Sequence, residues 1–180
     1  MRYFSGPPGA RSRRTSGHDY TGPGQYFITI RTYKGDPLFG EVEHGRMYLS
    51  PYGQIVVEEW QRTEERRQFV TIDEYIAMPD HFHGLIRLRR DPERSSRGSR
   101  EARLATVRPT PGLENPSPGS LSTVIGAFKS AATRRINRAR RTPGAKVWQP
   151  SFWDAIVGDH RSLALLRRYI RANPQRWRSD

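Results

Sequence analysis

The strand predicted to begin at Phe82 constrains the fold most, because it is apolar on both of its sides. Side chains alternate across a β-strand, so Phe82 and Ile86 point to one face and Leu85 points to the other. His81 and His83 share the face of Leu85. A strand of this kind is covered on both faces, so we expect it at the centre of a sheet with its histidine side at least partly enclosed.

The elements predicted around this strand follow a recognisable order. Runs of β-branched and aromatic residues predict strands at 26–32, 71–78, 82–88 and 151–157, and a small hairpin at 38–49. Apolar residues at helical spacing predict helices at 51–67, 120–141 and 159–173. Asp159 caps the last helix, and Pro174 is expected to stop it. Apart from the hairpin, this order is the α+β, ferredoxin-like βαββαβ arrangement with an antiparallel sheet, followed by an additional C-terminal helix.

Length and composition indicate one folded domain at residues 25–177. A chain of 180 residues with a hydrophobic fraction of 34% is long enough to bury a core. Residues 1–24 combine arginines with Gly, Pro and Ser, which predicts a flexible basic arm. Residues 89–119 are rich in Arg, Ser, Pro and Gly and lack periodicity, which predicts a flexible insertion rather than a domain boundary.

The excess of positive charge indicates a polyanionic partner, and nucleic acid is the first choice. Lys and Arg total 31 against 18 Asp and Glu, which gives a net charge of +13. A solvated basic surface and an RNA-associated structural role are the alternatives. We expect the DNA contacts to come from the arm, the helix at 120–141 and the last helix, through Arg11, Arg13, Arg14, Lys129, Arg134, Arg135, Arg138 and Arg168.

Three absences narrow the class of protein further. The chain has no cysteine, which excludes a disulfide framework and a thiolate zinc site. No apolar run approaches the ~18 residues of a membrane span, so a membrane is not an expected partner. The N-terminal residues lack the apolar core of a secretory signal peptide. We therefore expect a cytoplasmic protein that associates with the nucleoid.

Two histidines and one asparagine are the candidate metal ligands. His81 and His83 point to one face of their strand, and Asn173 lies one helical turn after Tyr169 on the flank of the last helix. If that helix covers the histidine face, two imidazole nitrogens and the Asn173 carboxamide oxygen can hold Mg²⁺ or Mn²⁺, with positions open for water and a phosphate oxygen. A hydrolytic Zn²⁺ also fits this set.

Tyr169 is the candidate nucleophile. A tyrosine hydroxyl attacks poorly unless a metal ion or cationic neighbours favour the phenolate, and Arg167, Arg168 and Arg171 flank it in sequence. Without the other motifs, a core aromatic with its hydroxyl at the surface is the simpler interpretation. Together with the histidines and the basic charge, Tyr169 predicts metal-assisted chemistry on a DNA strand.

Five motifs in order give the chain a resemblance to a known family. From about Tyr20 to Trp177 it resembles the REP-associated tyrosine transposases, which belong to the single-tyrosine HUH transposases. The matching segments are Asp19–Ile30, Met78–Gly84 (Met-Pro-Asp-His-Phe-His-Gly), Phe128–Ser130, Trp148–Asp154 and Tyr169–Pro174.

The resemblance implies a role for each residue of the candidate site. His81 and His83 would be the metal-binding pair with Phe82 as its bulky centre, and Asn173 would complete the metal site. Tyr169 would form a 5′-phosphotyrosine link with single-stranded DNA. The implied activity is that of an endonuclease and transposase which nicks and rejoins single-stranded DNA or hairpins formed by repeat palindromes.

The chain departs from the family pattern at one position, and this keeps a second function open. Relatives often carry histidine just after the acidic residue of the Trp-Gln motif, where this chain has Ala155. The alternative is therefore a catalytically weakened module of the same fold that binds hairpin DNA or RNA. Monomers and swapped-helix homodimers both occur in the broad family.

Overall fold

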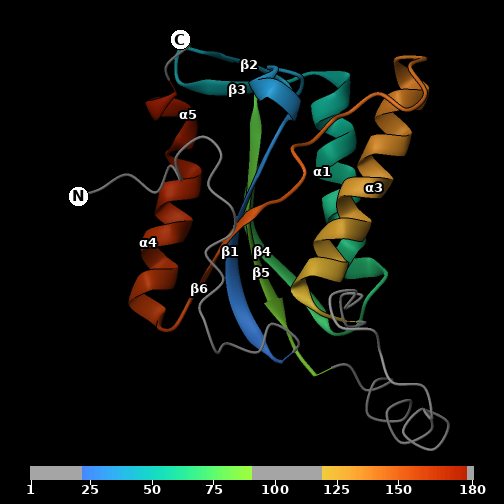
Figure 1. Cartoon of the computed structure of the whole chain (residues 1–180). Coiled ribbons are helices and arrows are strands. Elements are labelled where there is room, and N and C mark those ends of the chain that lie inside the picture. The colour runs from blue at the N-terminus through green and yellow to red at the C-terminus, as the bar shows by residue number, and fades with distance from the viewer. Residues whose placement is uncertain (1–21, 91–118, 178–180) are drawn as a thin grey trace, which may run out of the picture.

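The central sheet has four antiparallel strands, and helices cover both of its faces. The computed structural model describes residues 22–90 and 119–177. Across the sheet the strands are β4 (Val70–Met78), β5 (His81–Leu88), β1 (Gly24–Arg31) and β6 (Trp153–Ile156). Helices α1 (Pro51–Glu65) and α3 (Leu121–Ala139) lie on one side of the sheet and α4 (His160–Arg171) on the other, as Figure 1 shows. The predicted α+β order of elements is confirmed, and the sheet is antiparallel throughout.

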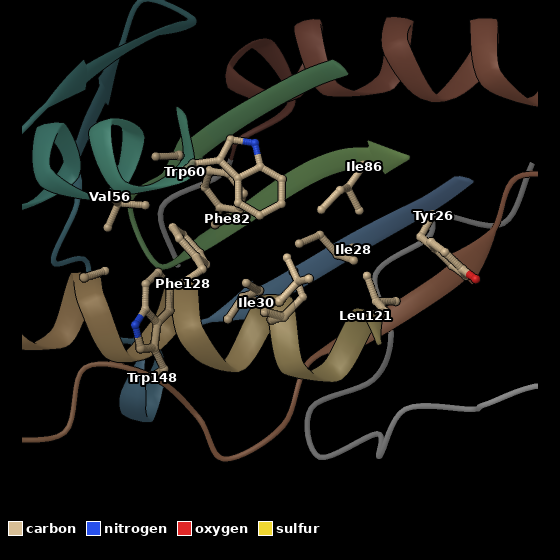
Figure 2. Packing of buried hydrophobic residues seen from close by; sticks show 14 of the residues in the cluster. Tyr26, Ile28, Ile30, Val56, Trp60, Phe82, Ile86, Leu121, Phe128 and Trp148 are labelled. Carbon is tan, nitrogen blue, oxygen red and sulfur yellow. The ribbon is translucent and has the colours of Figure 1, made fainter. Parts of the chain in front are cut away.

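Strand β5 has the central, doubly covered position predicted for it. It pairs with β4 on one side and with β1 on the other. Phe82 and Ile86 belong to the larger core beneath α1 and α3 (Figure 2). Leu85 belongs to a smaller core with Phe27 of β1 and with Leu163 of α4. The histidine-bearing face is therefore the one that α4 covers.

Aromatic rings build the larger core around Trp60 of α1. Its ring centroid lies 5.0 Å from that of Phe82 and 5.1 Å from that of Phe128 (Figure 2). A Cβ atom at Gly84 would come within 2.8 Å of the Trp60 ring, so the close approach of α1 to β5 requires glycine there. Truncating a buried aromatic of this kind to alanine costs about 3–5 kcal/mol. This side of the sheet therefore contributes much of the stability of the fold.

The predicted helix starts are confirmed, but the predicted end of the last helix is wrong. Ser50 caps α1 through Gly53, and Asp159 caps α4 through the backbone N–H of Ser162 at 2.8 Å. Helix α4 ends at Arg171, and a short helix α5 (Asn173–Arg176) follows it. Pro174 lies in the first turn of α5, where the missing N–H of proline carries no penalty, so it starts a helix there.

The small hairpin is also present, as β2 (Gly40–Glu43) and β3 (Arg46–Leu49). A one-turn helix η1 (Tyr33–Gly35), which the sequence did not predict, follows β1. Residues 1–21 of the arm and 91–118 of the insertion lie outside the described residues, and so do Arg11, Arg13 and Arg14. Within the described ranges, no helix has the length and apolar character needed to cross a membrane.

Candidate functional site

The histidine pair lies at the start of β5, on the face that α4 covers. His81 is aligned with Arg31 of β1 across the sheet, and His83 is aligned with Thr29. The two imidazole rings are 4.6 Å apart between centroids. The alternation of side chains along β5 thus places both rings side by side, as their spacing predicts.

His83 is fully enclosed and held at one ring nitrogen. Its side chain is stacked on Phe27 with 5.2 Å between ring centroids, and its Nδ1 lies 2.9 Å from the Thr29 hydroxyl oxygen. Burial, and then the neighbouring His81, lower the pKa of His83 well below its ordinary value. The imidazole is therefore neutral and retains a lone pair on one nitrogen, which is the state in which histidine binds metals.

His81 is held by a carboxylate from the turn that precedes β5. Its Nδ1 lies 2.5 Å from Oδ1 of Asp80. The backbone carbonyl of Asp80 in turn accepts hydrogen bonds from the backbone N–H and the hydroxyl of Thr32, at 2.8 and 2.9 Å. A carboxylate on Nδ1 fixes the proton there and leaves Nε2 of His81 able to bind a cation.

Tyr169 of α4 lies against this pair. Its hydroxyl oxygen is 3.5 Å from Nε2 of His83, at the long end of hydrogen-bonding distance. Its ring packs edge-on against His83 and Phe27, with centroid distances of 5.4 and 6.0 Å. The structure therefore brings the candidate nucleophile and a candidate metal ligand, which are 86 positions apart in the sequence, to one place.

Two ion pairs fix α4 on the sheet. Arg167 donates to both carboxylate oxygens of Asp73, at 2.9 and 2.7 Å, and Arg171 donates to Glu74 at 2.7 Å. Asp73 and Glu74 are consecutive, and side chains at consecutive positions of a regular strand point to opposite faces. A register shift in β4 between Ile72 and Tyr75 allows both acids to reach the same helix.

These ion pairs change one expectation about Tyr169. Arg167 and Arg171 have carboxylate partners, so their charge is not free to stabilise a phenolate as their sequence positions indicated. Arg168, the third flanking arginine, is exposed on α4.

Asn173 is buried at the start of α5, with 8% of its surface exposed. Within the described ranges no hydrogen bond joins it to His81, His83 or Tyr169. Nor do those ranges contain a cluster of three or more His, Cys, Asp or Glu side chains arranged to hold a metal. A cation at this site would be bound by Nε2 of His81 and Nε2 of His83. The Asn173 amide, water or a phosphate oxygen would supply its other ligands. An oriented imidazole pair with oxygen co-ligands fits Mn²⁺ or Mg²⁺.

The basic residues predicted to contact DNA divide into two groups. Lys129 donates from Nζ to the backbone carbonyls of Gln149, Pro150 and Ser151, at 2.7, 3.3 and 3.2 Å, and burial lowers its pKa to about 8. Arg135 pairs with Glu58 at 2.6 Å and with Glu59 at 2.9 Å.

The side chains of Lys129 and Arg135 thus bind partners inside the fold. The sequence pattern of α3 does not indicate these contacts. Arg134 and Arg138 are exposed on the same helix and are available to a phosphate backbone.

Sequence reasoning missed Thr29, Asp80 and Arg31. The first two hold the imidazoles, and Arg31 lies in register with His81. The signal for Thr29 and Arg31 is the alternation along β1, which places them on one face with Phe27. Ala155 of β6 is aligned with Phe27 on the same sheet. Asp80 directly precedes the histidine pair in the sequence.

Comparison with known proteins finds a relative in sequence. An uncharacterised protein of Haemophilus influenzae is 29% identical over 180 residues, which covers 99% of this chain and 96% of that protein. No protein-family model matches the chain.

The fold of the chain is similar to that of solved structures. A REP-associated tyrosine transposase bound to a REP hairpin superposes with a TM-score of 0.58 at 15% identity, over 93% of this chain and 73% of that chain. The match to a candidate transposase from Deinococcus radiodurans covers 88% of this chain and 95% of that chain, at 16% identity and a TM-score of 0.46. The chain therefore shares the α+β fold of the REP-associated transposase.

Proposed function

We propose that the protein cleaves and rejoins single-stranded or hairpin DNA through a covalent 5′-phosphotyrosine on Tyr169. The observation that carries the proposal is the 3.5 Å between the Tyr169 hydroxyl and Nε2 of His83. It sets a nucleophile beside a neutral imidazole in a chain of net charge +13. The fold shared with a REP-associated tyrosine transposase bound to a REP hairpin supports DNA as the substrate.

The candidate ligands of the metal are His81 and His83, each through Nε2, and Asn173 through its carboxamide oxygen. A divalent cation held by these residues, Mg²⁺ or Mn²⁺, would supply Lewis-acid polarisation of the phosphodiester. Asp80 and Thr29 hold the two imidazoles in the required orientation through Nδ1.

The reaction exchanges one phosphodiester for another. The Tyr169 phenol oxygen bonds to phosphorus and its proton passes to solvent, while the bond from phosphorus to the 3′-oxygen breaks. That oxygen takes a proton from solvent and leaves as a free 3′-hydroxyl, and the 5′-phosphate remains on the tyrosine. Attack by a 3′-hydroxyl on this linkage reverses the step and joins strands. Because one ester replaces another, no external energy source is needed.

The packing around Tyr169 favours this chemistry by orientation. Phe27 contacts both the Tyr169 and His83 rings, so it limits the directions in which the phenol can point. The ion pairs to Asp73 and Glu74 fix α4 on one flank, and Tyr169 projects from the other flank. Holding a nucleophile in place is worth several orders of magnitude in rate.

The experiment is covalent capture from a library. A labelled pool of random single strands, some joined to hairpin stems, is incubated with the full-length protein and Mg²⁺ or Mn²⁺, and adducts are separated on a denaturing gel. We expect an adduct with wild type and none with Tyr169→Phe, although both retain DNA. Sequencing the captured strands then gives the target. Binding without an adduct in wild type would instead favour the hairpin-binding module.

A further inference from the structure

Arg31 occupies a position at the candidate site that its other contacts do not explain. It is the last residue of β1 and is aligned with His81 of β5. Thr29, two residues before it, contacts His83 from the same face, so the Arg31 side chain starts on the histidine side of the sheet.

The guanidinium of Arg31 has no partner in the described part of the chain. Arg167 and Arg171, on the helix that covers the same face, each bind a carboxylate. No ion pair or side-chain hydrogen bond involves Arg31 within residues 22–90 and 119–177. Its backbone carbonyl accepts the N–H of Gln149 at 2.9 Å, so the backbone is fixed while the half-buried side chain donates to no described residue.

A half-buried guanidinium without a carboxylate partner, on the same sheet face as two imidazoles, is stabilised when an anion joins it. A guanidinium has five donors in a planar fork that matches two oxygens of one phosphate. We propose that Arg31 binds the non-bridging oxygens of the phosphodiester that Tyr169 attacks. This inference rests on the proposed function, because it names the residue that would hold the substrate phosphate at the same site.

Binding at this position would act mainly on the transition state. Attack on phosphorus places additional charge on the non-bridging oxygens, and a fixed guanidinium stabilises that charge more than it stabilises the ground state. Overall DNA affinity comes from many phosphate contacts, so the loss of one affects it little. Arg31 should therefore influence the rate of adduct formation far more than the affinity.

The first test observes the contact itself and does not depend on cleavage. The Nε–H signal of Arg31 in the ¹⁵N-labelled full-length protein is assigned by its absence in Arg31→Gln. The protein is then titrated to saturation with oligothymidylate without divalent metal. We expect the Arg31 signal to shift and to become protected from exchange with water. An unchanged signal at saturation would overturn the proposal.

The second test compares rates, with Arg87→Gln as the matched control. Arg87 is an exposed arginine on β5, on the same face but farther along the strand. Arg31→Gln should slow adduct formation on the order of 10²- to 10³-fold, with DNA affinity close to that of Arg87→Gln. Arg31→Lys keeps the positive charge but not the two-pronged guanidinium. It should therefore slow adduct formation less than Arg31→Gln does. Melting temperatures within about 2 °C of wild type show that each variant folds.

The outcomes separate this inference from the proposed function. Equal adduct rates for Arg31→Gln and Arg87→Gln contradict the role of Arg31 but leave Tyr169 as the nucleophile. If wild type forms no adduct, the proposed function is contradicted, and the shift of the Arg31 signal alone decides whether this residue binds phosphate.

Discussion

Replacing Arg135 and Arg134 separately by alanine tests which residues of α3 contact DNA. Arg135 binds two carboxylates of α1, whereas the adjacent Arg134 is exposed. Glu59, one of those carboxylates, has a side chain only 2% exposed, and the arginines around it lower its pKa despite burial. Arg135→Ala therefore removes an internal contact between two helices, whereas Arg134→Ala removes only surface charge.

The expected loss of stability in Arg135→Ala depends on the contacts that the two glutamates retain. Hydrogen bonds to charged groups contribute about 1.5–3 kcal/mol when nothing replaces them. Glu59 keeps Arg62 at 2.7 Å and Arg66 at 3.2 Å, so it is not left as an unpaired buried charge. The pair with Glu58 is largely exposed and adds about 0–1 kcal/mol. We therefore expect Arg135→Ala to cost about 1–2 kcal/mol, or about 2–8 °C in melting temperature.

Thermal unfolding and salt-dependent DNA binding read out the two effects separately. Arg134→Ala should change stability by less than about 0.5 kcal/mol. It should reduce the slope of log affinity against log salt by about 0.7–0.9, whereas Arg135→Ala should leave that slope unchanged. The reasoning is refuted if Arg135→Ala has wild-type stability, or if it weakens DNA binding as much as Arg134→Ala does.

Three further predictions concern Lys129, the pair of Asp73 with Arg167, and the candidate metal ligands. Lys129→Met should lower the melting temperature without changing the slope of log DNA affinity against log salt, because the three carbonyl acceptors of Lys129 lie within the fold. A reduced slope would instead show that Lys129 contacts DNA. Arg167 lowers the pKa of Asp73, so this pair stabilises the fold above the ordinary aspartate pKa and that stability is lost as pH falls through the lowered value. Urea unfolding at neutral and acidic pH should therefore show a smaller pH dependence for Asp73→Asn than for wild type, and an equal dependence would count against the pair. His81→Ala should abolish metal-dependent adduct formation and retain DNA affinity, with Asn173→Ala milder because water can replace an amide ligand; adducts undiminished in EDTA would exclude the ion.

Much of the fold was predictable because its determinants are local in sequence. The two-sided apolar character of β5 identified the central strand, and the cap at Asp159 marked the start of the last helix. Pro174 misled the prediction, because proline is both a frequent stop signal and a favoured first-turn residue. Only the backbone direction after Ala172 distinguishes these cases, and it depends on tertiary packing.

The candidate site was predictable only in part, because several of its features depend on tertiary contacts. The sequence placed Tyr169 on the flank of an amphipathic helix and both histidines on one strand face. The packing of α4 over that face, which was a condition of the prediction, brings Tyr169 to His83. The internal partners of Lys129 and Arg135 could not be predicted from the sequence. A basic residue on a helix has the same sequence pattern whether its side chain is solvated or binds a carbonyl or carboxylate far away in the sequence. Arg31 was overlooked for a similar reason, since its relevance depends on the pairing of β1 with β5.

The most direct test of the central claim is the mass of the peptide that carries the DNA. Adducts formed with wild type and Mn²⁺ are digested with nuclease and then with trypsin, which cuts after Arg168 and Arg171 and releases Tyr169–Arg171. We expect a nucleotide attached through its 5′-phosphate to this peptide alone. A nucleotide on any other peptide, or strand cleavage with every tyrosine unmodified, would contradict it.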